Sequence, residues 1–232
     1  MHFEPPKHGY HSLREFLKEY VMLVVGILTA LGLEHVITHH NHMKSAELAR
    51  HQIVAELRVN LEETKATQET NRKNAKPMVD LAEAVGEEIK SGASKQAINQ
   101  HVLAKIKAQG GFNVGISLPT LRREAWEVAV ANQSATYIPD EALRRYSAAY
   151  ATQRDSMAFA SQSSLTHFSG TRLMDALTEL ELKRVEPLEL LRVLRQLLST
   201  LGSAQSNLKE IQVQLEASLK GEPGSPAKAP AH

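Results

Sequence analysis

An uncharged apolar run over residues 20–33 limits what this chain can fold into more than any other stretch of the sequence. Apolar residues fill every side of the helix that the run would form, so every side needs an apolar environment. The rest of the chain is polar or amphipathic and offers no segment of comparable hydrophobicity to enclose the run. Lipid is the remaining environment, and the run therefore predicts a membrane span.

The flanks of the run supply the length that a span requires. About 20 apolar residues are needed to cross a hydrocarbon core of about 30 Å. Leu13, Phe16 and Leu17 extend the apolar surface before the run, and Val36 and Ile37 extend it afterwards. A helix over residues 13–37 would be about 37 Å long. The sequence therefore predicts a transmembrane helix over residues 13–38.

Two other interpretations of the run are a cleaved signal peptide and a helix that lies in the membrane surface. A signal peptide ends in small residues of the A-x-A kind, and the nearest approach here, Thr29 and Ala30, is followed by Leu31. A surface helix needs a strongly polar face, which residues 20–33 lack. An uncleaved anchor fits the sequence better than either alternative.

Basic residues close to the span indicate its orientation. Lys7, Arg14 and Lys18 precede it, whereas Lys44 and Arg50 are the nearest basic residues after it. This slight bias predicts a cytoplasmic N-terminus and an exported C-terminal portion. Over the whole chain, 27 basic and 26 acidic residues leave a net charge of +1, so nucleic acid is not a predicted partner. The absence of cysteine is compatible with either side of the membrane.

Composition predicts an all-α fold, because aromatic residues make up only 5% of the chain and helix-forming residues dominate. The predicted order is a flexible cytoplasmic start (1–12), the transmembrane helix (13–38), a stalk helix (39–76), a helical bundle (77–220) and a disordered tail (221–232). No helix breaker occurs between the span and Ala75. The stalk should therefore continue the span, pack from about residue 46 and lose contact near residue 65.

Proline, serine and glycine mark the predicted helix boundaries beyond the stalk. Four prolines should each begin a helix: Pro77, Pro119, Pro139 and Pro187. Ser91 and Gly92 should end the helix that Pro77 begins, and Ser94 should cap the next one. A loop is predicted over residues 111–118. Gly170 should break or kink the long helix that follows Pro139.

The final predicted helix has the strongest regularity in the sequence. Leucines recur with heptad spacing along it: Leu191, Leu194, Leu198, Leu201, Leu208 and Leu215. This seam is typical of a coiled coil, but neighbouring positions are apolar as well, which favours a helix packed within a bundle. The seam is thus an intramolecular core face or, alternatively, an oligomer interface. Within the span, Gly26 and Ala30 form a small-residue face that would allow close helix contact.

A histidine cluster follows the span directly. His35 and His39 are four residues apart, the helical spacing that places two imidazoles on one metal. One helix supplies only these two good ligands, so a polar belt at the membrane surface is the stronger interpretation. No bound metal or other cofactor is predicted, although a metal shared between copies of the chain is the alternative.

No catalytic residues are predicted, because the arrangements that support catalysis are incomplete. The chain has no cysteine nucleophile. Ser163, Ser164 and His167 are close in sequence, but they lack an orienting carboxylate and an oxyanion hole. The sequence therefore favours a protein that is not an enzyme.

Two short motifs carry a resemblance to a known family. Residues 23–31 read Leu-Val-Val-Gly-Ile-Leu-x-Ala-Leu, and residues 56–61 read Glu-Leu-Arg-x-Asn-Leu. They resemble the corresponding motifs of a bacterial family of unknown function that has one N-terminal span and a helical domain. Residues 124–129 (Glu-Ala-Trp-Glu-Val-Ala), followed by Leu143 and Tyr146, are similar to a helix pair of that family. The resemblance supports the membrane anchor and the helices, and it implies no particular activity. With the orientation that the basic residues indicate, the predicted location is the bacterial inner membrane, with the helical domain in the periplasm.

These observations predict a non-enzymatic interaction or scaffold protein, anchored in the lipid bilayer and presenting a helical face to a protein partner or to copies of itself. The alternative is a ligand- or metal-sensing module that uses His35 and His39. A cytoplasmic start of about twelve residues offers little material to relay a signal inward, which favours the first prediction.

Overall fold

The computed structural model describes residues 13–111, 115–162 and 165–223, without the side chains of residues 159–171 and 173. Within these residues the chain forms helices and no strand, so the all-α prediction is confirmed. The predicted flexible start (1–12) and residues 224–232 of the predicted tail lie outside the described residues.

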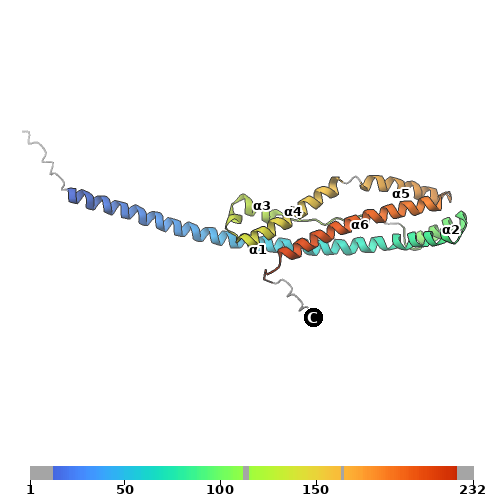
Figure 1. Cartoon of the computed structure of the whole chain (residues 1–232), viewed down its shortest axis with the longest axis horizontal. Helices are drawn as coiled ribbons and strands as arrows, with labels where there is room; N and C mark the ends of the chain where they lie inside the picture. The colour runs from blue at the N-terminus through green and yellow to red at the C-terminus, as the bar shows by residue number, and fades with distance from the viewer. Residues whose placement is uncertain (1–12, 112–114, 163–164, 224–232) are drawn as a thin grey trace, which may run out of the picture.

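One helix, α1 (Leu13–Lys90), forms the long axis of the molecule (Figure 1). Its 78 residues correspond to a length of about 117 Å. The N-terminal part extends alone from the rest of the protein, and the C-terminal part is the longest helix of the bundle. The prediction of one continuous helix from the span to Ala75 is confirmed.

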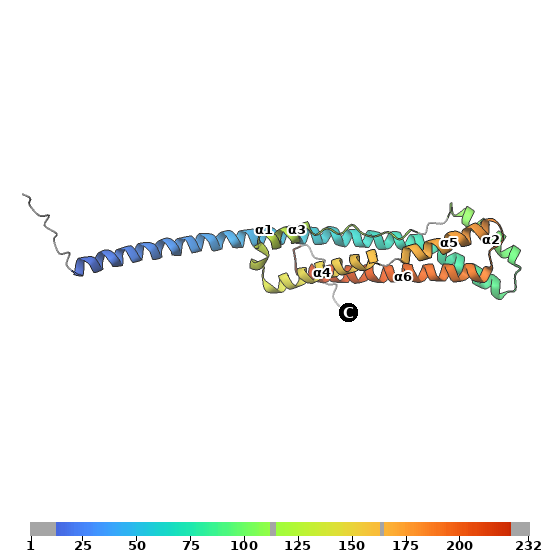
Figure 2. The same ribbon diagram turned by 90° about the horizontal axis from the view of Figure 1, so that it is seen from above.

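The remaining helices pack along the C-terminal part of α1 (Figure 1, Figure 2). α6 (Pro187–Ser218) runs antiparallel to α1, and α4 (Asp140–Gln162) and α5 (Leu165–Glu181) follow each other along α6. α2 (Lys95–Ala108) lies at the end farthest from the projecting part of α1. The short helix α3 (Glu124–Ala131) and the 3₁₀-helix η1 (Ser134–Tyr137) lie near the point where α1 leaves the bundle.

Two hydrophobic cores join α1 to α6. The first unites residues 46–61 of α1 with residues 208–219 of α6, together with α3, η1 and α4. The second unites residues 78–85 of α1 with residues 190–201 of α6, together with α2 and α5. The leucine series of the final helix lies in these cores, because Leu191, Leu194, Leu201, Leu208 and Leu215 are buried and Leu198 is partly buried. The seam is thus a core face within the chain.

Polar side chains separate the two cores. Asn60, Thr64, Thr67 and Asn71 are buried along one side of α1. Opposite them, Gln205 of α6 donates from its Nε2 to the backbone carbonyl of residue 68, at 3.3 Å. The prediction that the helix loses contact near residue 65 is wrong, because this polar stretch is packed and hydrogen-bonded.

The prediction that Pro77 begins a new helix is also wrong, since α1 runs through it to Lys90. A proline in a helix interior removes a backbone hydrogen bond and costs about 3 kcal/mol. Met78, Leu81 and Val85 directly after it are buried in the second core. Their burial contributes about 1.5–3 kcal/mol each and outweighs that cost. The predicted boundary between stalk and bundle therefore falls inside one helix.

An extended segment, residues 115–123, lies along α1 and is held by two asparagines. Asn71 donates from Nδ2 to the Ser117 carbonyl at 2.9 Å, and its Oδ1 accepts from the Ser117 amide at 2.8 Å. Asn60 makes the same two bonds with Arg122, at 2.7 and 2.9 Å. The helix from Asn60 to Asn71 and the extended chain from Ser117 to Arg122 both cover about 16.5 Å, so the two pairs are in register.

Of the other predicted boundaries, the helix start at Pro119 is wrong, whereas those at residues 91–92, Ser94, Pro139 and Pro187 are confirmed. The helix predicted from Pro119 begins at Glu124 as α3, because the asparagine contacts keep the backbone extended as far as Arg122. Gly170 does not break the helix, since α5 runs through it; α4 ends at Gln162 and α5 begins at Leu165, and residues 163–164 lie outside the described residues. Ser94 caps α2 by accepting from the Ala97 amide, and α6 begins at Pro187 as predicted.

Candidate functional site

The bundle meets the projecting part of α1 at the turn from η1 into α4. α3 starts beside Glu56 of α1, whose Oε2 accepts from the Ala125 amide at 3.0 Å. From there the chain runs back toward the N-terminal end of α1. Tyr137 at the end of η1 stacks on His42, with ring centroids 4.4 Å apart and 8° between the ring planes. This turn brings residues 137–139 beside the first turns of α1 beyond the predicted span.

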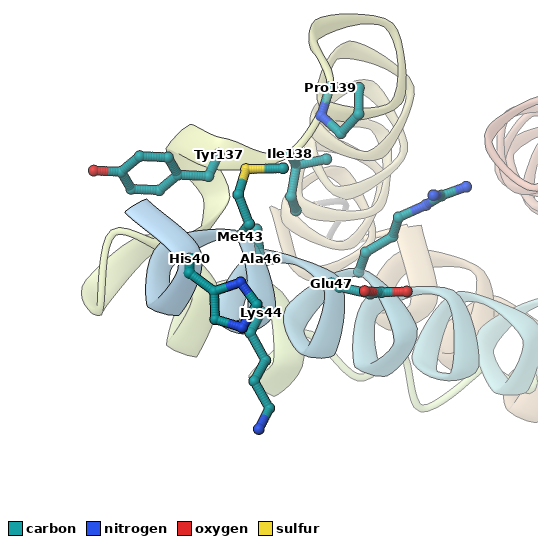
Figure 3. A pocket seen from close by; sticks show the side chains of 9 residues that line it. His40, Met43, Lys44, Ala46, Glu47, Tyr137, Ile138 and Pro139 are labelled. Carbon is teal, nitrogen blue, oxygen red and sulfur yellow. The ribbon is translucent and has the colours of Figure 1, made fainter. Parts of the chain in front are cut away.

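A cleft of about 450 Å³ lies between this turn and α1, and Figure 3 shows its side chains. The cleft, called here the span-proximal cleft, is lined by His40, Met43, Lys44, Ala46, Glu47 and Arg50 of α1 and by Tyr137, Ile138 and Pro139 of the turn. Met43 points toward Ile138 between the two walls, whereas Lys44 extends away from the turn (Figure 3).

The charged side chains of the cleft have different environments. Arg50 forms an ion pair at 2.7 Å with Glu222, a residue that does not line the cleft. Glu47 has His51 as its ion-pair neighbour, at 3.9 Å. Lys44 is exposed and forms no ion pair with any residue in the described part of the chain. A cation and a carboxylate one helical turn apart are thus open to a bound polar group.

Next to the cleft, the carboxylate of Glu222 binds two arginines and a tyrosine, a set called here the Glu222 network. Its Oε2 accepts from Arg50 at 2.7 Å, and its Oε1 accepts from the Tyr146 hydroxyl at 2.7 Å and from Arg145 at 3.3 Å. Only 1% of the Glu222 side chain is exposed, against 40% for Arg50 and 26% for Arg145. These contacts attach the residues after α6 to both α1 and α4.

The Glu222 network has a defined protonation state at neutral pH. Burial by itself would raise the pKa of Glu222, but the hydrogen bonds from Tyr146 and Arg50 and the charges of both arginines outweigh it and lower that pKa. The pKa of Tyr146 rises to about 12, first because its hydroxyl is desolvated and then because it donates to Glu222. An ionised carboxylate therefore accepts from a neutral phenol.

The prediction of a disordered tail over residues 221–232 is wrong for its first residues, because Glu222 and Pro223 contact the bundle. Glu222 is buried, and the carbonyl of Pro223 accepts from Arg58. Sequence reasoning missed this residue, because a glutamate between glycine and proline after the last helix carries no local signal of burial. The arginines that bind it lie far away in the sequence.

A second carboxylate, Glu56, fixes α3 and α4 to α1. Its Oε1 accepts from the Tyr150 hydroxyl at 2.6 Å, while its Oε2 accepts from the Ala125 amide. Trp126 stacks on Tyr150 with ring centroids 5.3 Å apart. Burial, and then the bond to Glu56, raise the pKa of Tyr150. The only tryptophan of the chain thus belongs to a packed cluster at the base of α3.

The predicted histidine pair and the predicted small-residue face lie on the projecting part of α1, apart from the cleft. His35 and His39 stack with centroids 6.5 Å apart and 18° between planes. Within residues 13–111, 115–162 and 165–223, no three His, Cys, Asp or Glu side chains come together as metal ligands. Apart from Gly26, its two neighbours and the adjacent backbone of α1, no described atom lies within 4 Å of a Cβ built on Gly26, and Ala30 is exposed.

The three residues considered for catalysis are outside the described part of the molecule. Ser163 and Ser164 lie between α4 and α5, and His167 belongs to α5 without a described side chain. The structure therefore does not describe how these three side chains are arranged.

Among the described residues, one helix, α1, is long and apolar enough to cross a membrane, and none of its most apolar window is buried. No family model, no curated protein and no solved structure matches the chain. The resemblance to the bacterial single-span family stays a prediction.

Proposed function

We propose that the chain is a single-pass membrane protein whose helical bundle is a non-enzymatic interaction module held close to the lipid surface. The bare N-terminal part of α1 carries the proposal. Except for half-buried Val24, the large apolar side chains between residues 13 and 37 are each more than half exposed. Monomers in water rarely expose contiguous apolar patches beyond a few hundred Å². A bilayer covers such a helix without any partner protein.

The proposed location is the bacterial inner membrane, with the N-terminus in the cytoplasm and the bundle in the periplasm. Lys7, Arg14 and Lys18 before the span support this orientation through the preference of basic flanks for the cytoplasmic side. The resemblance of residues 23–31 to the span of a bacterial family supports the membrane.

An interaction role is proposed because the two carboxylates that join the helices, Glu222 and Glu56, already have their hydrogen-bond partners within the chain. Glu222 is saturated by two arginines and Tyr146, and Glu56 by Tyr150 and a backbone amide. Both carboxylates join helices, and neither is presented as a reactive group. The exposed helical surface of the bundle is then left to contact a protein partner or a second copy of the chain.

Sensing of a metal or small ligand by His35 and His39 is the second candidate. Their stacked and exposed rings favour it, because two neighbouring imidazoles on one helix provide half of a tetrahedral zinc site. A second copy of the chain would supply the other two ligands. Metal analysis of the purified protein and of a His39→Ala variant tests this candidate.

Membrane anchoring is tested by alkaline carbonate extraction of membranes that contain the full chain. The wild type should stay in the pellet. The double variant Leu23→Arg/Leu28→Arg should be released, because each arginine near the middle of a span costs about 2.5–3.5 kcal/mol of insertion free energy. Val213→Arg is the matched control, since Val213 is 53% exposed on α6. Extraction of the wild type, or retention of the double variant, would contradict the proposal.

Orientation is tested with single cysteines, which the cysteine-free chain makes unambiguous. In intact spheroplasts a membrane-impermeant maleimide should label Glu210→Cys on α6, whereas His8→Cys should react only after lysis. The reverse pattern would place the bundle in the cytoplasm.

The interaction role is tested by photo-crosslinking in membranes, with a benzophenone maleimide on Glu210→Cys of α6 or on Asp175→Cys of α5, both exposed positions. Discrete adducts of higher mass are expected from at least one position. Their absence from both, together with a monomeric mass in detergent by light scattering, would contradict an interaction module.

A further inference from the structure

We infer that the span-proximal cleft binds the headgroup of a phospholipid of the phosphoethanolamine type. This inference rests on the proposed membrane anchoring and adds to it a specific lipid site. Among the described residues, the cleft lining combines an exposed lysine without an ion pair, an exposed carboxylate and an apolar wall, at the depth where headgroups lie.

The depth follows from the helix rise. Ile37 ends the apolar surface of the span, and His40 and Lys44 lie about 4.5 and 10.5 Å farther along the axis of α1. The headgroup layer on each side of a bilayer is about 5–7 Å thick, the difference between a core of about 30 Å and a total of about 40–45 Å. Side chains on a helix lean toward its N-terminus, which here is the membrane side. Lys44 extends away from the turn in Figure 3, but its ammonium stands on a flexible four-carbon stem, so a change of rotamer would bring it to a phosphate in the headgroup layer.

The turn of the bundle lies at the same depth. Tyr137 stacks on His42, which lies about 7.5 Å beyond Ile37 along α1. Tyrosine is enriched at membrane interfaces because its ring is apolar and its hydroxyl is polar. Exposed Met43 and buried Ile138 continue the apolar wall into the cleft. The cleft thus opens where the glycerol and phosphate groups of a neighbouring lipid are found.

The charges of the cleft match a zwitterionic headgroup better than an anionic one. Arg50 is neutralised by Glu222, so the lining offers Lys44 as a cation and Glu47 as an anion. These residues lie three positions apart and are neighbours on the helix surface. In phosphoethanolamine a phosphate and a primary ammonium are separated by two methylene groups. Lys44, assisted by His40, would bind the phosphate, and Glu47 would accept hydrogen bonds from the ammonium.

The volume and composition of the cleft agree with this occupant. Its volume of about 450 Å³ lies within the range of about 300–1,000 Å³ found for small-molecule sites. Apolar side chains with a few well-placed polar groups are typical of such sites. The acyl chains of the lipid would stay in the bilayer beside the projecting part of α1.

The test is native mass spectrometry of the full chain in detergent micelles, titrated with equal concentrations of phosphatidylethanolamine, phosphatidylcholine or phosphatidylglycerol. We expect phosphatidylethanolamine to bind about tenfold more tightly than the other two lipids. Lys44→Gln and Glu47→Gln should each weaken its binding about fivefold, as expected for one partly exposed charge-assisted contact. Lys76→Gln and Glu63→Gln are the matched controls, because both residues are exposed positions of α1 away from the cleft.

Two results would overturn the inference. Equal binding of the three lipids in wild type and variants would show a non-specific lipid annulus. A preference for phosphatidylglycerol that survives in Glu47→Gln would show an anionic site. Incorporation of the wild type into phosphatidylcholine nanodiscs, measured by co-elution, separates this failure from failure of the anchor. If the chain enters the discs but shows no lipid preference, only the headgroup site is refuted. If the chain does not enter the discs, the headgroup site and the membrane anchor are both refuted.

Discussion

Replacing Glu222 by glutamine should destabilise the bundle, although residue 222 lies beyond the last helix. The substitution keeps the size of the side chain and one oxygen that can accept from Tyr146. It removes the negative charge to which Arg50 and Arg145 are bonded at 2.7 and 3.3 Å. Two guanidinium groups would then face an uncharged amide at the junction of α1 and α4.

The expected loss follows from the burial of the three groups. Removing one partner of a fully buried ion pair costs about 3–5 kcal/mol. Here Arg50 and Arg145 are 40% and 26% exposed, so water partly solvates the guanidinium groups that the variant leaves behind. We therefore expect a loss of about 2 kcal/mol in the free energy of unfolding. In a chain of this size that corresponds to a Tm lowered by about 4–8 °C.

The pH dependence gives a second signature of the same carboxylate. The pKa of Glu222 is lowered in the folded chain from its ordinary value of 4.5. Its stabilising contribution is therefore fully present above pH 4.5 and is lost as the pH falls through the folded-state pKa. Glutamine does not titrate, so the Tm difference between wild type and Glu222→Gln should be constant near neutral pH and should shrink below about pH 4.5.

Thermal unfolding of the full chain in detergent, followed by circular dichroism, measures both effects. Glu210→Gln is the control, because Glu210 is an exposed glutamate of α6 and its replacement should change the free energy by less than about 0.5 kcal/mol. Equal Tm values for Glu222→Gln and Glu210→Gln would refute a stabilising network at Glu222. A Tm deficit that persists undiminished at about pH 3 would show that the charge is not its cause.

Three further substitutions test the fold. Leu201→Ala should cost about 2–5 kcal/mol, because Leu201 is 6% exposed, whereas Leu188→Ala at a half-exposed position should cost less than about 0.5 kcal/mol; equal Tm values would contradict the core role of the seam. Asn71→Ala should accelerate hydrogen exchange of the Ser117 amide about ten- to hundredfold by NMR, and an unchanged rate would show that Asn71 does not hold the extended segment. Pro77→Ala should raise the Tm by restoring a helix hydrogen bond worth up to about 3 kcal/mol, and a lowered Tm would mean that the proline ring contributes more through packing.

Features that depend on neighbouring residues in the sequence were predictable. The unbroken helix from the span to Ala75 follows from the absence of helix breakers, and Ser94 and Pro187 mark helix starts through local capping chemistry. The leucine series of α6 identified a buried face because helical periodicity records which side of a helix is apolar. The sequence did not decide whether this face packs against other helices of the same chain or against a second copy.

Local rules failed where packing decided the conformation. Pro77 should end a helix by its own chemistry, but the burial of Met78, Leu81 and Val85 keeps α1 continuous. Pro119 should begin one, but the bonds from Asn60 to Arg122 keep that backbone extended. In both cases the energy of contacts with distant residues exceeds the local preference.

The sequence by itself determined the helical class, the exposed apolar run of α1 and the buried side of α6, because each is recorded in the order of neighbouring residues. Only the tertiary structure decided the Glu222 network, the paired asparagine contacts and the span-proximal cleft. Arg50 and Glu222 are 172 positions apart, and Asn60 and Arg122 are 62 apart. Such pairs meet only when the residues after α6 and the extended segment 115–123 fold back along α1, so these polar contacts carry no periodic or local signal in the sequence.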